Sequence, residues 1–355
     1  MILSSVELSH LRNIGSAALN LHGGVNLLVG PNGSGKTTIL EAIHCLSTGR
    51  SFRSPNLDLL IQHGAADCLV RGELNRDGLK HRLAVQRMRG GDRRIRLDGE
   101  DVQRASELAA LLPLLVLHPG TVDLVQGPPD LRRRFMNWGL FHVKPGFQDT
   151  WQGANRSLRQ RNRALRENRP DAELETWTAT LIGYAEQIDT DRQSYMASLE
   201  AAFSDLVRDH GRLEDVVLSY QRGWSKDEEL GEIYRRDAEK DRERGFTARG
   251  FHRADVKISV SGAPADQVCS RGELKLLAWL LTIAQGQLAE HGLVYLVDDP
   301  LAELDQSILL ELGELMALSA EQLVVTGTHL GSLAQVWPTR EQRVFHVEHG
   351  TVKEH

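Results

Sequence analysis

Short apolar runs separated by turn residues dominate the N-terminal third of the chain. Residues 25–29 form a continuous apolar run, and apolar positions then recur with helical spacing over residues 37–46. Residues 69–74 and 79–85 lie on either side of an Asn-Arg-Asp-Gly turn sequence, which predicts a β-hairpin. This region therefore reads as strands, turns and one helix.

The same alternation continues further along the chain. Asp98-Gly99 predicts a second hairpin, and residues 114–117 predict a buried strand. The elements predicted in the C-terminal third are strands at residues 256–260, 293–297 and 323–326 and helices at residues 273–290 and 309–318. A continuous apolar run such as 293–297 is typical of a central parallel strand, so a mixed or parallel sheet is expected.

The middle of the chain follows a different pattern, in which apolar residues recur every seven positions. The repeat comprises Leu174, Leu181, Ile188, Tyr195 and Ala202. This spacing predicts a long amphipathic helix packed on a partner helix. The upstream residues 131–166 would supply the partner, and Pro170 would mark the turn between them. Few heptads are present, so a short helical hairpin is expected rather than an extended coiled coil.

Charged side chains dominate residues 226–244. This segment holds six basic and eight acidic residues and almost nothing apolar. Such a composition predicts a solvated face or a mobile segment. The α/β pattern thus starts at the N-terminus, is interrupted by a helical insert and resumes near residue 250.

Composition narrows the class of protein only moderately. The 355 residues are 41 % hydrophobic and 25 % charged, which fits a globular protein of about two domains and excludes a disordered chain. The net charge of −6 does not point to nucleic acid, although a local basic patch can still bind phosphates. Cys45, Cys68 and Cys269 lack the Cys-x-x-Cys spacing of a zinc site. No signal-peptide pattern or membrane-length apolar run is visible, so a cytoplasmic protein without a membrane partner is expected.

Residues 30–37, Gly-Pro-Asn-Gly-Ser-Gly-Lys-Thr, carry the strongest chemical signal. They match the GxxxxGK[ST] pattern of a phosphate-binding loop, with a predicted strand before them and a helix after them. The glycines let backbone N–H groups converge on phosphates, and the helix N-terminus adds a partial positive charge. Lys36 would reach the β- and γ-phosphates, and the Thr37 hydroxyl would hold Mg²⁺. ATP with Mg²⁺ is therefore the expected ligand.

Two carboxylates, Asp298 and Asp299, directly follow the apolar run at residues 293–297. A buried strand that ends in this way fits a Walker B site, in which Asp298 would hold Mg²⁺ through water. Asp299 would orient or deprotonate the attacking water. Alone, the pair could be a loop start or a helix cap. Phosphoryl transfer needs both this element and the loop, so Lys36, Asp298 and Asp299 are the predicted catalytic residues.

A third motif, Cys-Ser-Arg-Gly-Glu-Leu-Lys at residues 269–275, precedes a predicted helix. Locally it is a capped helix start, with Ser270 and Glu273 as a capping box. Together with the other two motifs it resembles the signature motif of the ATP-binding-cassette ATPases. In that superfamily the Ser and Gly of one protomer contact the γ-phosphate held by the other. Ser270 and Gly272 would make these contacts. The motif can be a capped helix start and a signature motif at the same time.

Further residues make the resemblance narrower. They are Leu11-Arg12-Asn13 before the loop, residues 49–53 after its helix, residues 124–135 before the insert, Gln160-Arg161-Asn162 within it, and residues 251–255 before the signature. In combination they resemble the RecF family, the SMC-like ATPases of bacterial DNA replication and repair. The resemblance implies an α/β ATP-binding-cassette head, a P-loop NTPase with a mixed sheet, and a short inserted helical arm lobe.

The resemblance also implies how the chain is divided and which residues contact the nucleotide. Residues 1–135 would form the N-terminal part of the head, 136–250 the helical arm, and 251–355 the C-terminal part of the head. The implied nucleotide contacts are Arg12, Asn13, Gly30, Asn32, Gly33, Ser34, Gly35, Lys36, Thr37, Thr38, Ser270, Gly272 and Asp305. Asp305 would belong to the D-loop or would cap a helix. His329 would be a switch histidine or a surface or capping residue.

The chain departs from the family pattern at three places. Gly120-Thr121-Val122 follow Pro119 where acidic residues are common, so no Q-loop residue is assigned. The Gly-Pro-His-Arg stretch of the family reads Gly-Phe-His-Arg at residues 250–253. In the signature, Arg271 and Glu273 flank the glycine where a Gln is commoner, which would alter contacts between protomers more than nucleotide chemistry.

Six arginines and one acidic residue fall within residues 156–169, a local charge of +5. Arg156, Arg159, Arg163 and Arg166 follow the spacing i, i+3, i+7, i+10, so a helix would carry them along one side. Guanidinium groups in such a row can follow a duplex phosphate backbone without reading bases. The alternative is a solvated arm face, and Arg132–Arg134 could be an ion-pair cluster at the base of the arm.

The resemblance implies an ATP-induced homodimer that clamps double-stranded DNA near gaps and hydrolyses ATP slowly. It also implies a role in DNA repair, replication restart and the SOS response, with RecO and RecR as partners in recombinase loading. Two other classes stay open: the ATPase subunit of a transporter, and a non-catalytic assembly module that binds ATP as a structural ligand.

Overall fold

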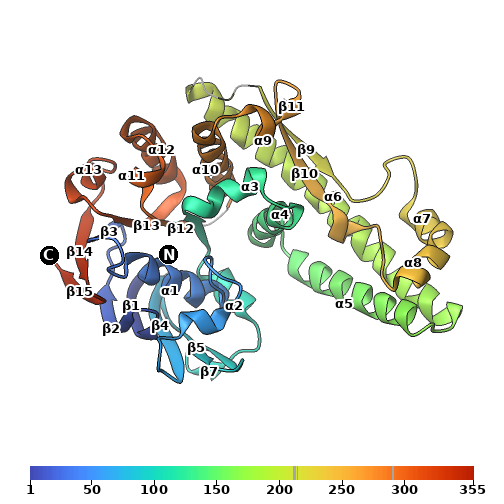
Figure 1. Cartoon of the computed structure of the whole chain (residues 1–355), viewed down its shortest axis with the longest axis horizontal. Helices are drawn as coiled ribbons and strands as arrows, with labels where there is room; N and C mark the ends of the chain where they lie inside the picture. The colour runs from blue at the N-terminus through green and yellow to red at the C-terminus, as the bar shows by residue number, and fades with distance from the viewer. Residues whose placement is uncertain (211–212, 214, 290–291) are drawn as a thin grey trace. The chain divides into compact units, whose positions relative to one another are not determined.

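Two units make up the polypeptide, and the computed structural model describes residues 1–210, 213, 215–289 and 292–355 (Figure 1). Unit 1 combines Met1–Thr121 with Trp279–His355, and unit 2 is Val122–Ala278. Sheets and helices alternate as the sequence predicts for the α/β class. The boundaries predicted from the sequence, at 135/136 and 250/251, divide the chain by function and not by packing. They stay a prediction. None of the described helices combines the length and apolar character needed to span a bilayer.

An antiparallel sheet forms the first layer of unit 1. Its strands run in the order β2-β1-β4-β5-β6-β7. Their bounds are Ile2–Leu11 (β1), Ile14–Asn20 (β2), Asp67–Arg76 (β4), Leu79–Met88 (β5), Arg93–Leu97 (β6) and Glu100–Asp101 (β7). Both predicted hairpins are confirmed, since Arg76 pairs with Leu79 and Leu97 with Glu100.

A second sheet, mostly parallel, carries the chemistry-bearing loops. Its order is β15-β14-β3-β13-β12-β8, and only β15 runs antiparallel to its neighbour. The bounds are Val25–Val29 (β3), Leu114–Leu117 (β8), Leu293–Val297 (β12), Ala320–Gly327 (β13), Gln342–Glu348 (β14) and Thr351–Glu354 (β15). The carboxyl ends of β3, β13 and β12 lie at one edge, because Gly327 pairs with Val29 and Val297 with Val325.

One helix, α1 (Lys36–Thr48), joins the two sheets in a single core. Its Ile39, Leu40, Ile43 and Leu46 are fully buried. The antiparallel sheet contributes Leu3, Val6 and Val70 to this core and the parallel sheet contributes Leu28, Leu296 and Val324. Each buried aliphatic side chain contributes about 1.5–3 kcal/mol to folding, so α1 and the loop before it are held rigidly.

Further helices complete unit 1. They are a 3₁₀ helix at Leu57–Leu60, α2 (Ala105–Leu111), a 3₁₀ helix at Pro119–Val122 that continues into unit 2, α11 (Pro300–Glu303), α12 (Gln306–Ser319) and α13 (Leu330–Ala334). Helix α10 (Arg271–Gln287) begins in unit 2 and ends in unit 1. The predicted end of this helix at Glu290 lies outside the described residues.

Unit 2 is mainly helical. It contains α3 (Asp123–Gln126), α4 (Pro129–Val143), α5 (Phe147–Arg166), α6 (Asp171–His210), α7 (Leu230–Arg236), α8 (Ala238–Arg244) and α9 (Ala265–Val268). A 3₁₀ turn at Phe251–Arg253 precedes a small sheet of order β11-β10-β9, with β9 at Val216–Gln221, β10 at Asp255–Val260 and β11 at Ala263–Pro264.

The predicted helical hairpin is confirmed as α5 and α6, which lie side by side (Figure 1). Leu181 and Ile188 are fully buried on the α6 stripe, and Tyr195 is nearly so. The upstream partner segment consists of two helices rather than one. Lys144, Pro145 and Gly146 separate α4 from α5, and Gly146 has a left-handed φ of 81° that a helix interior does not allow.

The prediction of a solvated or mobile segment at residues 226–244 is wrong in part. The segment forms α7 and α8, and Leu230, Ile233 and Tyr234 are buried. Asp241 is also buried, because it forms an ion pair with Arg161 of α5 at 2.9 Å. Composition alone does not show which few residues of a charged stretch find a buried partner.

Candidate functional site

The phosphate-binding loop connects β3 to α1 within unit 1. Its strand is buried along its whole length, and the loop runs from Gly30 to Lys36, where α1 begins. Gly33 and Gly35 have φ angles of 78° and 117°, a region that other residues rarely adopt. These two glycines turn the backbone so that the loop wraps in front of the helix N-terminus, as an anion cradle requires.

Lys36 lies inside the cradle. Its Nζ donates hydrogen bonds to the carbonyl oxygens of Gly30 at 2.7 Å and Pro31 at 2.9 Å. Burial lowers the pKa of Lys36 below its ordinary value, and the charges of Asp299 and Asp298 oppose this shift. The ammonium group therefore sits where a phosphate oxygen could replace the two carbonyl oxygens.

Thr37 and Asp298 face each other across the edge of the parallel sheet. The Thr37 hydroxyl lies 2.8 Å from Oδ1 and 3.1 Å from Oδ2 of Asp298. A hydroxyl and a carboxylate are oxygen donors of the kind that Mg²⁺ prefers, with water and phosphate oxygens completing the shell. The pair fits a Mg²⁺ site in which Thr37 would bind the ion and Asp298 would hold it through water. No group of three or more His, Cys, Asp or Glu side chains suited to a metal occurs among the described residues.

Asp299 has an unusual backbone and an unusual environment. Its φ and ψ are 46° and 57°, which is left-handed, and it precedes α11. Its pKa is raised, mainly by burial and further by Asp298 and Glu303, whereas Lys36 and His329 lower it. A carboxylate with a raised pKa beside a phosphate cradle is suited to accept a proton from water.

Thr326, at the end of β13, connects these two carboxylates. Its hydroxyl donates to Asp298 Oδ1 at 2.8 Å and accepts the backbone N–H of Asp299 at 2.9 Å. Thr326 belongs to none of the sequence motifs. The available signal was a threonine that ends a buried strand, but the register between β12 and β13 was needed to place it.

Arg12 and Asn13 form the two-residue turn between β1 and β2. Asn13 Nδ2 donates to the Gly33 carbonyl at 3.2 Å, and its Oδ1 accepts the Thr38 hydroxyl at 3.0 Å. Asn13, which is predicted to contact the nucleotide, thus binds the loop and α1 through its side chain. Arg12 pairs instead with Glu41 of α1, where Nη2 lies 2.7 Å from Oε1.

Glu41 is fully buried and was also missed by the sequence analysis. It accepts hydrogen bonds from Arg12 and from the Ser51 hydroxyl, and Arg53 lies 3.6 Å away. The Glu41 carboxylate thus connects α1 to the turn before the loop and to the segment at residues 51–53. A single acidic residue inside an apolar helix face was the signal that could have revealed it.

The signature residues lie in unit 2, at the start of α10. The Ser270 backbone N–H donates to Glu273 at 2.7 Å, and the Glu273 N–H donates to the Ser270 hydroxyl at 3.3 Å, so the predicted capping box is confirmed. Hydrogen bonds to the Glu273 carboxyl from the backbone and the side chain of Ser270 lower its pKa. Gly272 is exposed, and a Cβ placed there would meet no atom within 4 Å among the described residues. The helix start is therefore accessible to a ligand.

Asp305 and His329 occupy the N-cap positions of α12 and α13 in unit 1. Neither side chain makes a capping hydrogen bond in the structure. The charge of His329 opposes the rise in the pKa of Asp299. Asn32 and Gly33 are exposed on the loop, while Ser34 is buried.

The arginines of the arm divide into two groups. Arg161 is buried, contacting Thr178, Asp241 and Thr247 and lying over the ring of Tyr234. The other group is exposed on α5 and comprises Arg156, Arg159, Arg163 and Arg166. Arg163 pairs with Glu167 and Arg166 reaches the Gly245 carbonyl, whereas no described residue forms an ion pair with Arg156 or Arg159.

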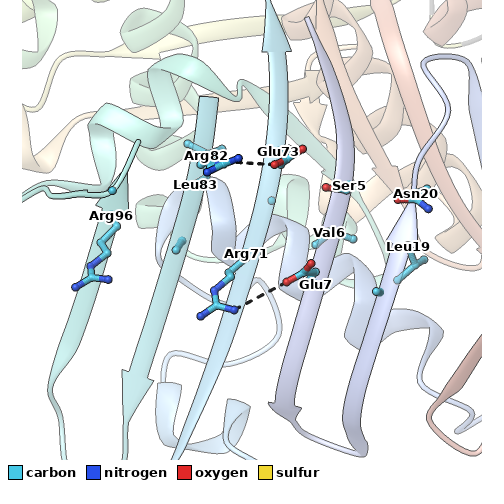
Figure 2. Close-up of a pocket in the computed structure, with 14 residues that line it drawn as sticks. Ser5, Val6, Glu7, Leu19, Asn20, Arg71, Glu73, Arg82, Leu83 and Arg96 are labelled. Carbon is cyan, nitrogen blue, oxygen red and sulfur yellow. Dashed lines mark ion pairs between the residues drawn. The ribbon is translucent and has the colours of Figure 1, made fainter. Parts of the chain in front are cut away.

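A hollow of about 540 Å³ lies on the open face of the antiparallel sheet (Figure 2). Four of its charged residues form two ion pairs, because Arg71 lies 4.0 Å from Glu7 and Arg82 lies 3.3 Å from Glu73 (Figure 2). The fifth, Arg96, pairs with Asp101 outside the hollow. None of the phosphate or Mg²⁺ candidates lines it. The hollow is therefore separate from the candidate nucleotide site.

Known proteins are similar to this chain over almost its whole length. The family model described as "RecF/RecN/SMC N terminal domain" matches residues 2–353. The chain is similar to "DNA replication and repair protein RecF" of Pseudomonas aeruginosa (strain LESB58), with 39 % identity over 100 % of this chain and 98 % of the relative. A similar protein of the same name from Azotobacter vinelandii is 38 % identical over 99 % of this chain and 98 % of the relative.

Solved structures show the same fold. "Structure of the recombination mediator protein RecF-ATP in RecFOR pathway" gives a TM-score of 0.88 at 23 % identity, covering 99 % of this chain and 97 % of that one. A Smc head domain with an extended coiled coil from Pyrococcus furiosus gives 0.60 at 16 % identity, covering 99 % and 95 %. The predicted cassette-type head is confirmed as a fold.

Proposed function

This chain belongs to the RecF family of DNA replication and repair proteins, and on that premise we propose that it is an ATP-dependent DNA-binding ATPase. ATP and Mg²⁺ join two copies of the chain, the dimer clamps duplex DNA near gaps, and slow hydrolysis stimulated by DNA releases it. RecO and RecR are its proposed partners in recombinase loading during repair, replication restart and the response to DNA damage. Family membership supports this role, and the site geometry supports the nucleotide chemistry.

The observation that carries the proposal is the convergence of Lys36, Thr37, Asp298 and Asp299 at one sheet edge. Thr37 and Asp298 are 2.8 Å apart, although they are separated by 261 positions in the chain. A phosphate-binding loop and a strand-end carboxylate pair in this arrangement are the two parts that phosphoryl transfer requires.

Each residue has a distinct task in this mechanism. The Lys36 ammonium group releases its hydrogen bonds to the carbonyl oxygens of Gly30 and Pro31 and binds the β- and γ-phosphate oxygens instead. The loop N–H groups and the N-terminus of α1 bind the same phosphates. Thr37 and Asp298 hold Mg²⁺, which supplies positive charge to the phosphate oxygens when bound. Asp299 orients the attacking water and accepts its proton.

The second protomer completes the site in this proposal. Ser270 and Gly272 of the partner subunit face the γ-phosphate, since a hydroxyl and free N–H groups at a helix start suit an anion. The open space around Gly272 and the length of α10 support this part. Asp305 lies at the same interface. In functional terms, residues 1–135 and 251–355 form the head and 136–250 the arm.

Duplex DNA lies along the exposed arginine row of α5 in this proposal. Arg156, Arg159, Arg163 and Arg166 are all exposed, so they are available to phosphates. Contacts to the phosphate backbone carry no sequence information, which suits a protein that acts at gaps of any sequence.

One binding experiment tests the function. Duplex-DNA affinity is measured without nucleotide, with ADP, and with ATP plus Mg²⁺, over a salt series. We expect tight binding only with ATP and Mg²⁺, and no such gain for the Lys36→Ala variant. The same affinity for duplex DNA in all three nucleotide conditions would contradict the clamp. Absence of binding at low salt would leave a nucleotide-binding protein whose partner is not DNA.

A further inference from the structure

The last hairpin of the chain contacts the phosphate-binding loop within unit 1. In β14 and β15, Glu348 pairs with Thr351, so His349 and Gly350 form a two-residue turn. Their φ angles are 46° and 77°, both positive as in a type I′ turn. The backbone N–H of Gly350 donates a hydrogen bond to the Ser34 carbonyl at 2.9 Å. A backbone group in the middle of the loop is therefore held by the C-terminal turn.

The contact leaves no space for a side chain. A Cβ at Gly350 would lie 2.5 Å from the carbonyl oxygen of Asn13, and Gly350 itself is buried. At the start of the loop, a Cβ at Gly30 would lie 2.0 Å from the carbonyl oxygen of Val347 in the same hairpin. Both approaches are to backbone atoms, which cannot move aside as a flexible side chain could.

Asn13 also connects the C-terminal turn to the phosphate-binding loop. Its carbonyl oxygen lies beside Gly350, and its side chain forms hydrogen bonds with the Gly33 carbonyl and the Thr38 hydroxyl. The turn at residues 12–13, the C-terminal turn and the loop thus fix one another. Displacement of the C-terminal turn must displace Asn13, the loop or both.

We propose that the His349–Gly350 turn is a positioning element of the nucleotide site, which holds the loop at Ser34 in the conformation that binds phosphates. The proposal rests on the proposed function, because it assumes that the loop binds ATP. It assigns a part in nucleotide affinity to a C-terminal segment that carries no nucleotide-binding motif. No contact of Gly350 with ATP itself is required.

The chain offers a closely matched control turn. Asp77 and Gly78 form another two-residue hairpin turn, with φ angles of 52° and 81°, and a Cβ at Gly78 would meet nothing within 4 Å. Gly350→Ala and Gly78→Ala therefore impose the same left-handed strain. Only Gly350→Ala adds a methyl group against Asn13.

The test measures ATP binding and steady-state ATP hydrolysis for both variants, with Lys36→Ala alongside. We expect Gly350→Ala to raise the Kd and KM for ATP by about tenfold, as befits loss of one hydrogen bond with displacement of the loop, and to change kcat much less. Gly78→Ala should match the unaltered protein. Equal effects of the two variants, or unaltered affinity in Gly350→Ala, would overturn the proposal. Tight ATP binding by Lys36→Ala would instead contradict the proposed function.

A second measurement covers the case in which Gly350→Ala does not fold. Amide hydrogen exchange of the unaltered protein is followed with and without ATP and Mg²⁺. Because coupling is reciprocal, nucleotide that orders the loop should slow exchange in the peptide around Gly350 as well as in the loop. The peptide around Gly78 should not change. Protection of the loop without any protection around Gly350 would overturn the proposal.

Discussion

The hydroxyl of Thr326 donates a hydrogen bond to Asp298 across 2.8 Å and thereby fixes the orientation of that carboxylate. The same oxygen accepts the backbone N–H of Asp299 at 2.9 Å, which helps to hold Asp299 in its left-handed conformation. A residue outside all the motifs thus positions both carboxylates of the proposed catalytic pair.

Replacing Thr326 with Val should lower the rate of ATP hydrolysis. The change keeps the shape of the side chain but leaves the Asp298 carboxylate with one hydroxyl donor, Thr37, instead of two. It also leaves the N–H of Asp299 without its acceptor. Residues that orient a metal ligand typically affect activity by about 10- to 100-fold, so a loss of that size is expected in kcat. Thr326→Ser, which retains the hydroxyl, should stay close to the unaltered protein. An equal loss in both variants would show that the hydroxyl alone does not account for the effect.

Asp299→Asn should separate nucleotide binding from hydrolysis. The amide cannot accept a proton from water, but Lys36, Thr37 and the loop remain intact. ATP binding and ATP-dependent dimerisation should persist, measured by fluorescence titration and light scattering, while hydrolysis falls by at least about 100-fold. An undiminished turnover would remove Asp299 from the role of general base.

Charge reversal on the arm should weaken DNA binding. Arg156→Glu with Arg159→Glu removes two exposed cations for which no described residue supplies an ion-pair partner. The affinity for duplex DNA should fall, and its dependence on salt should become shallower by about one to two phosphate contacts. Arg71→Glu with Arg82→Glu makes the same change in net charge on the open sheet face. Equal loss in both double variants would indicate an effect of overall charge.

Arg161→Met should destabilise unit 2. The substitution leaves the buried carboxylate of Asp241 without its cation, and breaking such a pair costs about 3–5 kcal/mol. Chemical denaturation should show this loss in the free energy of unfolding. Arg163→Ala, on the exposed side of the same helix, should leave unfolding almost unchanged. A stable Arg161→Met variant would mean that Asp241 reaches water or takes up a proton.

His44 should make stability depend on pH. Burial lowers its pKa from 6.5 to about 4, and the nearby charge of His118 adds to the decrease. The unfolded chain therefore binds a proton at His44 below pH ~6.5 that the folded chain does not bind until pH ~4. The free energy of unfolding should fall as the pH drops through this window, by up to about 1.4 kcal/mol per unit. His44→Gln should reduce this slope, and His63→Gln, at an exposed histidine, is the control.

Local patterns carried most of the information about the phosphate-binding loop. A buried strand, a glycine-rich turn and an apolar helix are contiguous in the chain, so their arrangement follows from residues 25–48 alone. The α5–α6 hairpin was predictable for a similar reason, because its heptad stripe and the proline turn lie close together in sequence.

The residues that the sequence did not reveal depend on long-range pairing. Thr326 joins the site only through the parallel register of β12 and β13, and Arg161 is buried only because Asp241, 80 positions later, lies against α5. Glu41 gathers Arg12 and Ser51 from both sides of α1. Periodicity describes one element at a time, so it cannot show which polar residue of one element will meet another.

The position of β3 in its sheet has a consequence for synthesis of the protein. Its hydrogen-bonded neighbours are β13 and β14, which begin at Ala320 and Gln342. The antiparallel sheet, in contrast, is complete by Asp101. During translation the antiparallel layer can therefore form early, while β3, which carries the nucleotide loop, stays without its neighbours until β13 and β14 have been synthesised. Nascent or truncated chains that end before β14 should consequently be unable to bind nucleotide.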